Sequence, residues 1–202
     1  MKIQYIIKYQ ILYTVFVTLF CFFSFVAFSS GLQKIDSLKT VLKITPDSEK
    51  AAIFNALSEE ILYDSEEYSF EFADSALKYA KKFNLKTEEL SALTNLGEAS
   101  YFSSNLNKAK DFYQKALSLS IELNDSSFIA INYSNLGYAF LELENYQDAL
   151  NNFSKALEYE RLLKSDIGVA STINNIGSTY EYLGRYKNAL DHYLEALKMY
   201  EN

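Results

Sequence analysis

The same residues recur at four positions every forty residues through the second half of this 202-residue chain. The recurring set is an asparagine, a glycine two residues later, and two alanines seven residues apart. Its members are Asn95, Asn135 and Asn175; Gly97, Gly137 and Gly177; Ala109, Ala149 and Ala189; and Ala116, Ala156 and Ala196. A fixed period of this size is typical of a solenoid, in which each supersecondary unit packs on its neighbours.

The composition favours helices within each unit. One proline and six glycines are too few for the hairpins and tight corners of an all-β protein. From Tyr186 to Tyr200 the apolar residues fall at steps of three and four, a spacing that only an amphipathic helix aligns on one face. The small residues should let paired helices approach closely. The predicted fold class is therefore all-α: a right-handed α-solenoid of antiparallel helix pairs, preceded by an apolar leader helix.

The leader carries the pattern of a secretion signal. Lys2 and Lys8 are the only charges in the first 33 residues, and residues 11–28 carry none. Small residues follow at 27–31, as at a signal-peptide cleavage site. The apolar run is also just long enough to span a bilayer, so residues 1–30 are interpreted as a signal peptide or an uncleaved signal anchor. Either alternative exports the rest to the periplasm or cell envelope, with residues 11–28 as the only expected membrane contact.

The exported part is acidic and contains no cysteine. Cys21 is the only cysteine and lies in the leader, so no disulfide is expected. The whole chain has a formal net charge of −7, and loss of the two leader lysines makes it about −9. Such a charge argues against nucleic acid as a partner.

After the leader the chain divides into a short cap and four repeats. Residues 31–47 are predicted to form an N-terminal capping helix that Pro46 ends, with Asp47 or Ser48 capping the next helix. Polar residues rather than prolines separate the helices that follow. The predicted repeats span about 48–86, 87–126, 127–166 and 167–202, within an array of 48–202.

The repeats resemble tetratricopeptide (TPR) repeats. The resemblance is carried by Asn135-Leu136-Gly137, repeated at 95–97 and 175–177, and by the Ala-x-x-x-aromatic-x-x-Ala pattern that follows each copy. The first repeat departs from the pattern, with Leu57 at the glycine position, Ser69 at the first alanine and Ala73 at the aromatic. The whole layout resembles the extracytoplasmic TPR region of bacterial TPR sensor kinases and regulators. Kinase activity is not carried over, because no output domain follows the repeats.

The resemblance places the first helix of each pair on a concave face. Asn55, Asn95, Asn135 and Asn175 would form a ladder there, able to bond an extended peptide backbone. Aromatic and acidic residues should lie beside the ladder, a mixture that suits a segment with apolar side chains and some positive charge. They are Tyr101, Phe102, Tyr138 and Tyr182, together with Glu98, Glu142 and Glu181. The alternatives are that the amides bond neighbouring helices or water, and that the aromatic rings fill grooves between helices.

Catalytic, metal and cofactor chemistry is not expected. His192 is the only histidine and is interpreted as a solvent-facing residue, and acidic pairs are consecutive rather than on one helix face. The glycines are isolated, so no phosphate-binding loop is present. No enzyme activity, cofactor or metal is predicted.

The expected function is that of a non-catalytic TPR scaffold or adaptor that binds a protein or peptide outside the cytoplasm. One alternative is a sensor module, or a truncated fragment, of a TPR-containing signal-transduction protein. Another is a structural module that self-associates through its C-terminal helix, where the stripe of Leu190, Tyr193, Leu197 and Tyr200 lacks a following helix to cover it.

Overall fold

The structure is a computed structural model that describes residues 35–201. Residues 35–45 and residues 46–201 belong to separate compact units. The predictions for residues 1–30, including the leader helix, its cleavage and its anchoring, lie outside the described residues. No helix within residues 35–201 has the length and apolar character needed to cross a bilayer.

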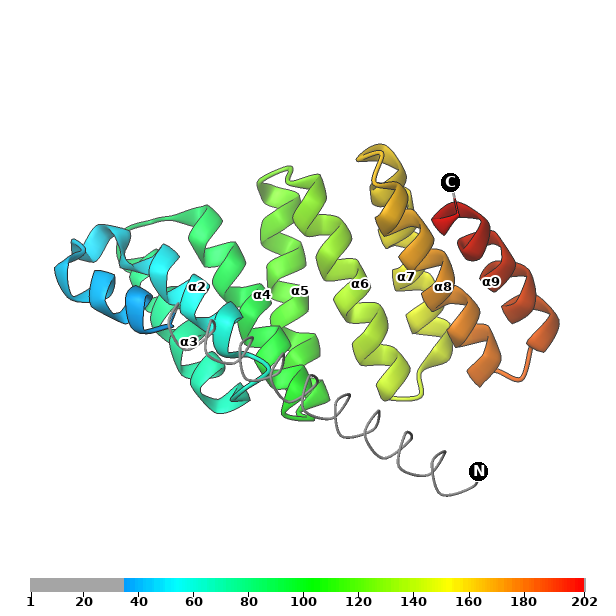
Figure 1. Ribbon diagram of the computed structural model, residues 1–202, viewed down its shortest axis with the longest axis horizontal. Coiled ribbons are helices and arrows are strands. Elements are labelled where there is room, and N and C mark those ends of the chain that lie inside the picture. The colour runs from blue at the N-terminus through cyan, green and yellow to red at the C-terminus, as the bar shows by residue number, and fades with distance from the viewer. Residues whose placement is uncertain (1–34, 202) are drawn as a thin grey trace, which may run out of the picture. The chain divides into compact units, whose positions relative to one another are not determined.

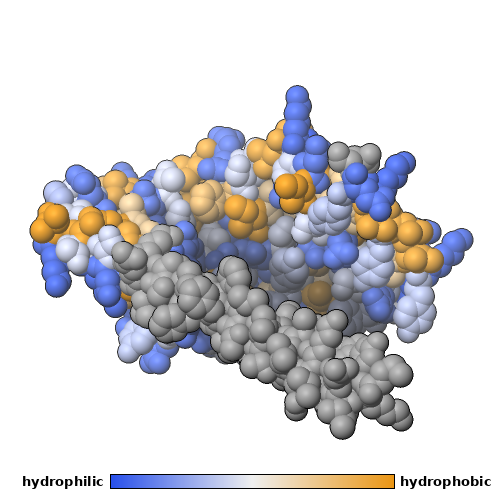
Figure 2. Space-filling view, viewed as in Figure 1, coloured by the Kyte–Doolittle hydropathy of each residue, from blue (hydrophilic) through white to orange (hydrophobic). Residues whose placement is uncertain are grey.

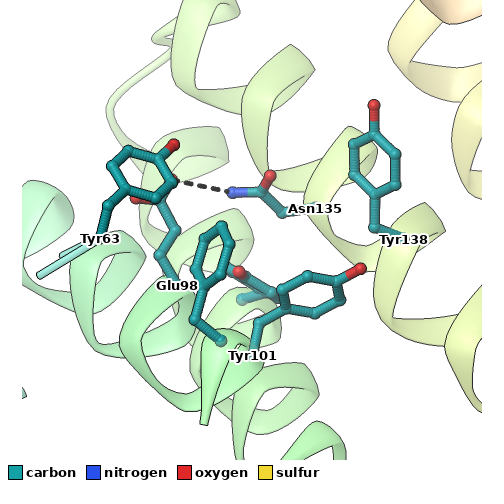
Figure 3. Close-up of a pocket in the computed structure, with 7 residues that line it drawn as sticks. Tyr63, Glu98, Tyr101, Asn135 and Tyr138 are labelled. Atoms are coloured by element: carbon teal, nitrogen blue, oxygen red, sulfur yellow. Dashed lines mark hydrogen bonds between the residues drawn. The ribbon is translucent and has the colours of Figure 1, made fainter. Parts of the chain in front are cut away.

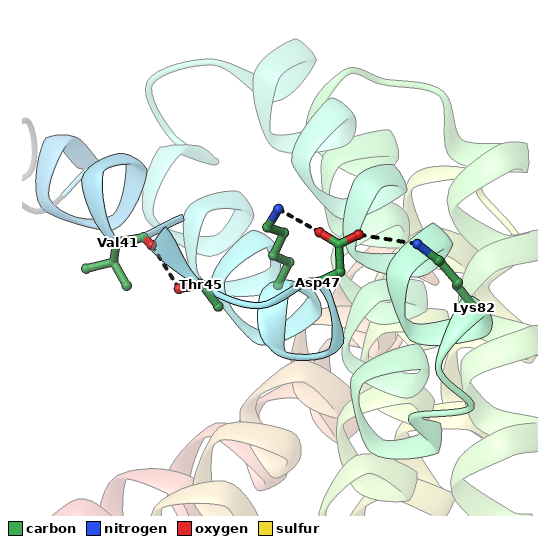
Figure 4. Close-up of polar contacts among 5 residues, drawn as sticks. Val41, Thr45, Asp47 and Lys82 are labelled. Atoms are coloured by element: carbon green, nitrogen blue, oxygen red, sulfur yellow. Dashed lines mark hydrogen bonds and ion pairs between the residues drawn. The ribbon is translucent and has the colours of Figure 1, made fainter. Parts of the chain in front are cut away.

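The first described unit is a single helix over residues 35–44. Thr45 follows its last residue, and the backbone N–H and side-chain hydroxyl of Thr45 both donate to the carbonyl of Val41, at 3.0 and 2.8 Å (Figure 4). Pro46 follows and, lacking an N–H, cannot continue the helix. The predicted stop is confirmed, whereas the role of this helix as a cap on the solenoid stays a prediction.

The second unit begins with a short 3₁₀ turn, η1 (Asp47–Glu49). The expectation that Asp47 or Ser48 would cap the next helix was wrong, because the N-cap residue is Glu49 and its side chain makes no capping hydrogen bond. Asp47 instead accepts from Lys50 at 2.7 Å and from Lys82 at 3.3 Å (Figure 4). These bonds, led by that of Lys50, lower the pKa of the Asp47 carboxyl.

Eight α-helices follow η1 within the described residues, and consecutive helices run antiparallel (Figure 1). They are α2 (Lys50–Ile61), α3 (Glu66–Lys82), α4 (Lys86–Phe102), α5 (Leu106–Glu122), α6 (Ser126–Glu142), α7 (Tyr146–Leu162), α8 (Asp166–Tyr182) and α9 (Tyr186–Tyr200). Each predicted repeat range corresponds to one pair of these helices, except that α4, α6 and α8 each begin one residue early, on the last residue of the preceding range. The prediction of an all-α fold built from helix pairs is confirmed.

A residue in the left-handed conformation follows each helix from α3 to α8, at intervals of twenty residues. These residues are Asn84, Ser104, Asn124, Glu144, Lys164 and Gly184, with φ between 54° and 70°. The residue after each one donates its N–H to a carbonyl five positions back, as Leu85 does to Ala80 at 2.8 Å and Arg185 to Tyr180 at 2.9 Å. This is the Schellman arrangement, which satisfies carbonyls that the helix end leaves free. The polar stops predicted from the sequence are confirmed.

The periodic small residues lie where consecutive helices touch. A Cβ on each periodic glycine would overlap the aromatic ring of its own repeat's second helix: Tyr113 for Gly97, Phe153 for Gly137 and Tyr193 for Gly177. The six periodic alanines are at most 3% exposed. Glycine therefore admits the ring, and alanine admits the neighbouring helix, as the sequence pattern predicted.

The first pair, α2 and α3, reaches the same packing with other residues. Leu57 and Ala73, at the glycine and aromatic positions, are fully buried, so the large side chain comes from the first helix instead of the second. Ser69, at the first alanine position, donates to the carbonyl of Ser58 at 2.9 Å. The Ser58 hydroxyl donates back to the carbonyl of Ser69 at 2.8 Å. The departures from the repeat pattern are thus compensated in pairs.

Candidate binding surface on the first helices

The four periodic asparagines all lie on the first helices of their pairs, α2, α4, α6 and α8. Asn95 donates its side-chain N–H to the Asn55 carbonyl and to the Glu59 carboxylate, both at 3.3 Å. Asn55 in turn donates to the Glu88 carbonyl at 3.1 Å. Asn55 and Asn95 are buried, and their amide nitrogens join α2 to α4.

The two later asparagines repeat this linkage nearer the surface. Asn135 donates to the Glu98 carboxylate at 3.5 Å, and Asn175 donates to the Tyr138 hydroxyl at 2.6 Å. Both side chains are half-buried. The amides therefore bond neighbouring first helices, the alternative that the sequence analysis left open, and the binding role of the ladder stays a prediction.

A pocket of about 300 Å³ opens between the first helices of the second and third pairs (Figure 3). Its wall comes from the turn after α2, from α4 and α5, and from α6. The lining residues are Tyr63, Glu98, Tyr101, Phe102, Tyr113, Asn135 and Tyr138. Five residues predicted for the binding face are thus brought together, namely Glu98, Tyr101, Phe102, Asn135 and Tyr138.

The aromatic rings of the pocket form a connected wall. Tyr63 meets Phe102 edge to face, with ring centroids 5.3 Å apart, and Phe102 meets Tyr101 in the same way at 5.6 Å. On the α6 side, Tyr138 packs its ring against Phe153 at 5.2 Å. Edge-to-face contacts are a preferred arrangement of aromatic pairs. They therefore favour the ring orientations that line the pocket.

Burial dominates the electrostatics of the pocket. It raises the pKa of the Glu98 carboxyl, an effect that the Asn135 hydrogen bond opposes and the nearby Glu59 carboxylate reinforces. Burial also raises the pKa values of the Tyr101 and Tyr113 hydroxyls, with the Glu142 and Glu98 carboxylates adding to the respective shifts. Both hydroxyls therefore stay protonated at neutral pH and are available as hydrogen-bond donors and acceptors.

The match to known families decides what kind of repeat this is. A family model described as the tetratricopeptide repeat matches residues 88–159 and 128–202, which together make more than half of the chain. This chain belongs to the tetratricopeptide repeat family. The resemblance drawn from the asparagine, glycine and alanine positions is confirmed. No match was found among curated proteins.

Solved TPR-type structures share the fold. A Rap protein complexed with competence and sporulation factor superposes with a TM-score of 0.75 and 19% identity, covering 85% of this chain and 49% of that chain. A STAND signal-transduction ATPase with a TPR sensor, from Pyrococcus horikoshii, has a TM-score of 0.76 and 16% identity, covering 84% of this chain and 27% of that chain. BtubC from P. vanneervenii has a TM-score of 0.69 and 19% identity, covering 75% of this chain and 63% of that chain. This chain spans less than two thirds of the length of each.

Other residues predicted for the TPR binding face lie apart from the pocket. Tyr182 is 63% exposed at the end of α8 and stacks on Tyr146, with ring centroids 5.9 Å apart and planes 10° from parallel.

His192 is partly buried rather than fully solvent-facing, because its Nδ1 lies 2.8 Å from the Asn188 carbonyl and its ring contacts Tyr180. Within residues 35–201, no group of three or more histidine, cysteine or acidic side chains could hold a metal ion.

Two pocket residues were not predicted from the sequence. Tyr63 belongs to the turn after α2 and so falls outside the forty-residue register of the TPR signature. Tyr113 occupies the aromatic position of the second-helix signature and packs against Gly97, yet it also lines the pocket. The sequence contains an indication of this second role. The equivalent residue in the next repeat is Phe153, and the extra hydroxyl of Tyr113 on a buried ring needs polar surroundings.

Proposed function

We propose that this TPR chain is a non-catalytic scaffold that binds a protein or peptide on the face formed by its first helices. The observation that carries the proposal is the aromatic pocket between α4 and α6, which collects side chains from three successive helix pairs. Tyr63 is 80% exposed and Phe102 is 42% exposed at its mouth. Exposed aromatic residues around a pocket are typical of the anchoring sites of protein interfaces.

On the proposed binding face, Asn135 and Asn175 would supply the polar contacts to a ligand. Asn55 and Asn95 are buried between helices, whereas Asn135 and Asn175 keep part of each amide at the surface. An amide that already bonds one helix retains a carbonyl oxygen that can accept from a peptide N–H. The Rap protein complexed with competence and sporulation factor supports a peptide or protein ligand by analogy of fold.

The proposed location is outside the cytoplasm, in the periplasm or cell envelope, with residues 1–30 as a leader helix that is either cleaved or retained as an anchor. The support is the uncharged run at 11–28 preceded by Lys2 and Lys8. Fusing a reporter that is active only outside the cytoplasm to the C-terminus tests the location. Reporter activity that persists when residues 1–30 are deleted would refute it.

Partner capture tests the binding function. The full chain is used as bait for cell-envelope proteins, beside the double variant Tyr63→Ser/Phe102→Ser, which removes two exposed rings from the pocket mouth. The matched control is Tyr68→Ser, since Tyr68 is 55% exposed on the second helix α3. We expect the double variant to lose a partner that wild type and control retain. Equal capture by all three proteins would exclude the pocket face.

A sensor module is the second candidate. The observation that favours it is the likeness to the STAND protein, whose repeats are described as a TPR sensor. A gene organisation in which the same reading frame continues into a transmembrane helix and an output domain would favour this alternative.

Self-association is the third candidate, and the exposed face of α9 favours it. Leu190 and Leu197 are 56% and 52% exposed, while Leu150, which stands at the Leu190 position one repeat earlier, is 7% exposed. Elsewhere on the face that Figure 2 shows, hydrophobic residues are interspersed with hydrophilic ones. A second copy could cover α9 as α8 covers α7.

A further inference from the structure

The pocket between α4 and α6 combines aromatic rings with a carboxylate and contains no basic residue. Five of its seven lining residues are aromatic, and the others are Glu98 and Asn135. A site of this composition has a negative potential, because the faces of aromatic rings and the carboxylate both attract positive charge.

Glu98 has no cationic partner among the described residues. Its one polar contact there is with the Asn135 amide at 3.5 Å, at the long end of hydrogen bonding. A carboxylate drawn out of water is unfavourable unless a counter-charge and hydrogen bonds accompany it. The pKa of the Glu98 carboxyl is raised for the same reason, because burial destabilises its charged form. A cation that entered the pocket would supply the missing counter-charge.

The hydroxyls near Glu98 extend the set of acceptors. Tyr101 and Tyr113 line the same pocket, and the Tyr113 hydroxyl lies close enough to Glu98 for the carboxylate to add to the rise in its pKa. The Tyr138 hydroxyl already accepts from Asn175. A guanidinium carries five N–H donors and an ammonium carries three, so a basic side chain can use a carboxylate and several hydroxyls at once.

Cation and ring contacts already occur elsewhere in this chain. The Lys108 ammonium lies 3.8 Å from the centre of the Phe70 ring, which in turn meets Phe112 edge to face. That contact is on the second helices, away from the pocket. An ammonium over the face of a ring is therefore a contact that this protein already contains.

The size of the pocket fits one side chain. Its volume of about 300 Å³ lies at the lower end of the range for ligand sites, which is roughly 300–1,000 Å³. An amphipathic helix would need a longer groove, whereas a single arginine or lysine reaches into such a space with its aliphatic stem along the rings.

We propose that this pocket anchors a basic side chain, arginine or lysine, of the polypeptide bound on the first helices. The inference rests on the proposed function and specifies the chemistry of the partner. Glu98 pairs with the charged head, the rings of Tyr63, Phe102 and Tyr101 hold the stem, and the hydroxyls take the remaining donors. The acidic balance of the whole chain, −7, favours the approach of a basic segment.

The test uses short acetylated and amidated peptides, Gly-Ser-X-Ser-Gly, with X as arginine, lysine, citrulline or norleucine. Citrulline keeps the shape of arginine without its charge, and norleucine keeps the stem of lysine. Binding to the full chain is followed by NMR of labelled tyrosine rings, with the signals assigned through Tyr101→Phe and Tyr138→Phe. We expect the arginine and lysine peptides to shift these signals and to bind about tenfold or more tightly than their neutral counterparts.

The matched variants are Glu98→Gln and Glu122→Gln, which remove the same charge from the pocket and from an exposed position at the end of α5. Glu98→Gln should weaken the binding of the arginine and lysine peptides about tenfold, and Glu122→Gln should change their binding affinity less than twofold. Equal binding of charged and neutral peptides, equal effects of the two variants, or unshifted pocket tyrosines would each overturn the inference. Partner capture that depends on Tyr63 and Phe102 but not on Glu98 would leave the proposed function standing alone.

Discussion

The ring of Tyr113 lies so close to the backbone of Gly97 that a Cβ on the glycine would overlap it. Tyr113 is 2% exposed, and its ring joins Ala109, Leu136 and Ala139 in one buried cluster. The ring therefore has little freedom to move aside. Its position also brings the hydroxyl to the pocket, so one side chain serves both the packing of a repeat and the wall of the candidate site.

Gly97→Ala should destabilise the protein by about 1–3 kcal/mol, because overpacking of a filled core outweighs the roughly 1 kcal/mol that alanine gains over glycine in a helix. Gly168→Ala is the control, since the obstacles to a Cβ there are the flexible end of the Glu160 side chain and the Ser165 hydroxyl rather than a buried ring. Urea unfolding measures both. A Gly97→Ala protein as stable as the control would show that the ring can shift.

Ser58 and Ser69 should behave as a coupled pair. Each donates to the other's carbonyl, and their hydroxyl oxygens are 3.0 Å apart in a fully buried position. Either serine changed to alanine alone should lower the free energy of unfolding by about 1 kcal/mol. The double variant should lose less than the sum, because no hydroxyl is left without its partner. Strictly additive losses in a double-mutant cycle would contradict the pairing.

The asparagines should divide into structural and surface members. Asn95→Ala removes a buried amide that donates to the Asn55 carbonyl and to Glu59, so we expect a loss of about 1–3 kcal/mol. Asn175→Ala, at a half-buried site, should lose about 1 kcal/mol or less. Thermal unfolding ranks the two. The reverse order would mean that Asn175 contributes more to stability than Asn95.

Glu98 should make stability fall as pH rises. Burial raises its pKa above the ordinary value of 4.5, so the folded chain binds this proton more tightly than the unfolded chain does. The contribution is complete below about pH 4.5 and is lost as the pH passes through the raised pKa. Glu98→Gln should therefore gain stability over wild type on going from acid to neutral pH, measured by urea unfolding. A pH-independent difference between the two proteins would count against a buried carboxyl.

Leu197→Asp tests the exposed face of α9. If that face joins two copies, the mass of the full chain in solution should rise with concentration, and the variant should abolish the rise. Leu162→Asp is the matched control, since Leu162 is 72% exposed at the end of α7. A strict monomer at all concentrations, or equal effects of both variants, would exclude self-association through this helix.

The sequence was most informative where one residue type answers one geometric need. Gly97 and its repeats mark where a ring must enter, and the polar residues after each helix mark left-handed stops, so helix pairs and their packing followed from spacing. The ion pairs of Asp47 could not be predicted in this way, because its two lysine partners lie three and thirty-five residues further along the chain and follow no repeat pattern.

The candidate site was less predictable, since its members obey different constraints. Glu98 and Tyr138 share one position, three residues after a periodic asparagine, and the pattern placed them on one face. Whether an asparagine amide there points outward or along the stack depends on the neighbour it meets in another repeat. Tyr63 enters from a turn outside the repeat signature, where periodicity carries no information.

The uniform junctions have a consequence for how such an array can change length. From α4 to α8 every helix has seventeen residues, and the same three-residue turn with a left-handed stop joins the helices within and between pairs. Removing or duplicating forty residues at matching turns would restore every junction and return each side chain to an equivalent neighbour. A gain or loss that is not a multiple of forty residues would misalign the stack. Whole pairs are therefore the natural steps by which the length of this surface, and with it the length of the proposed ligand, can be adjusted.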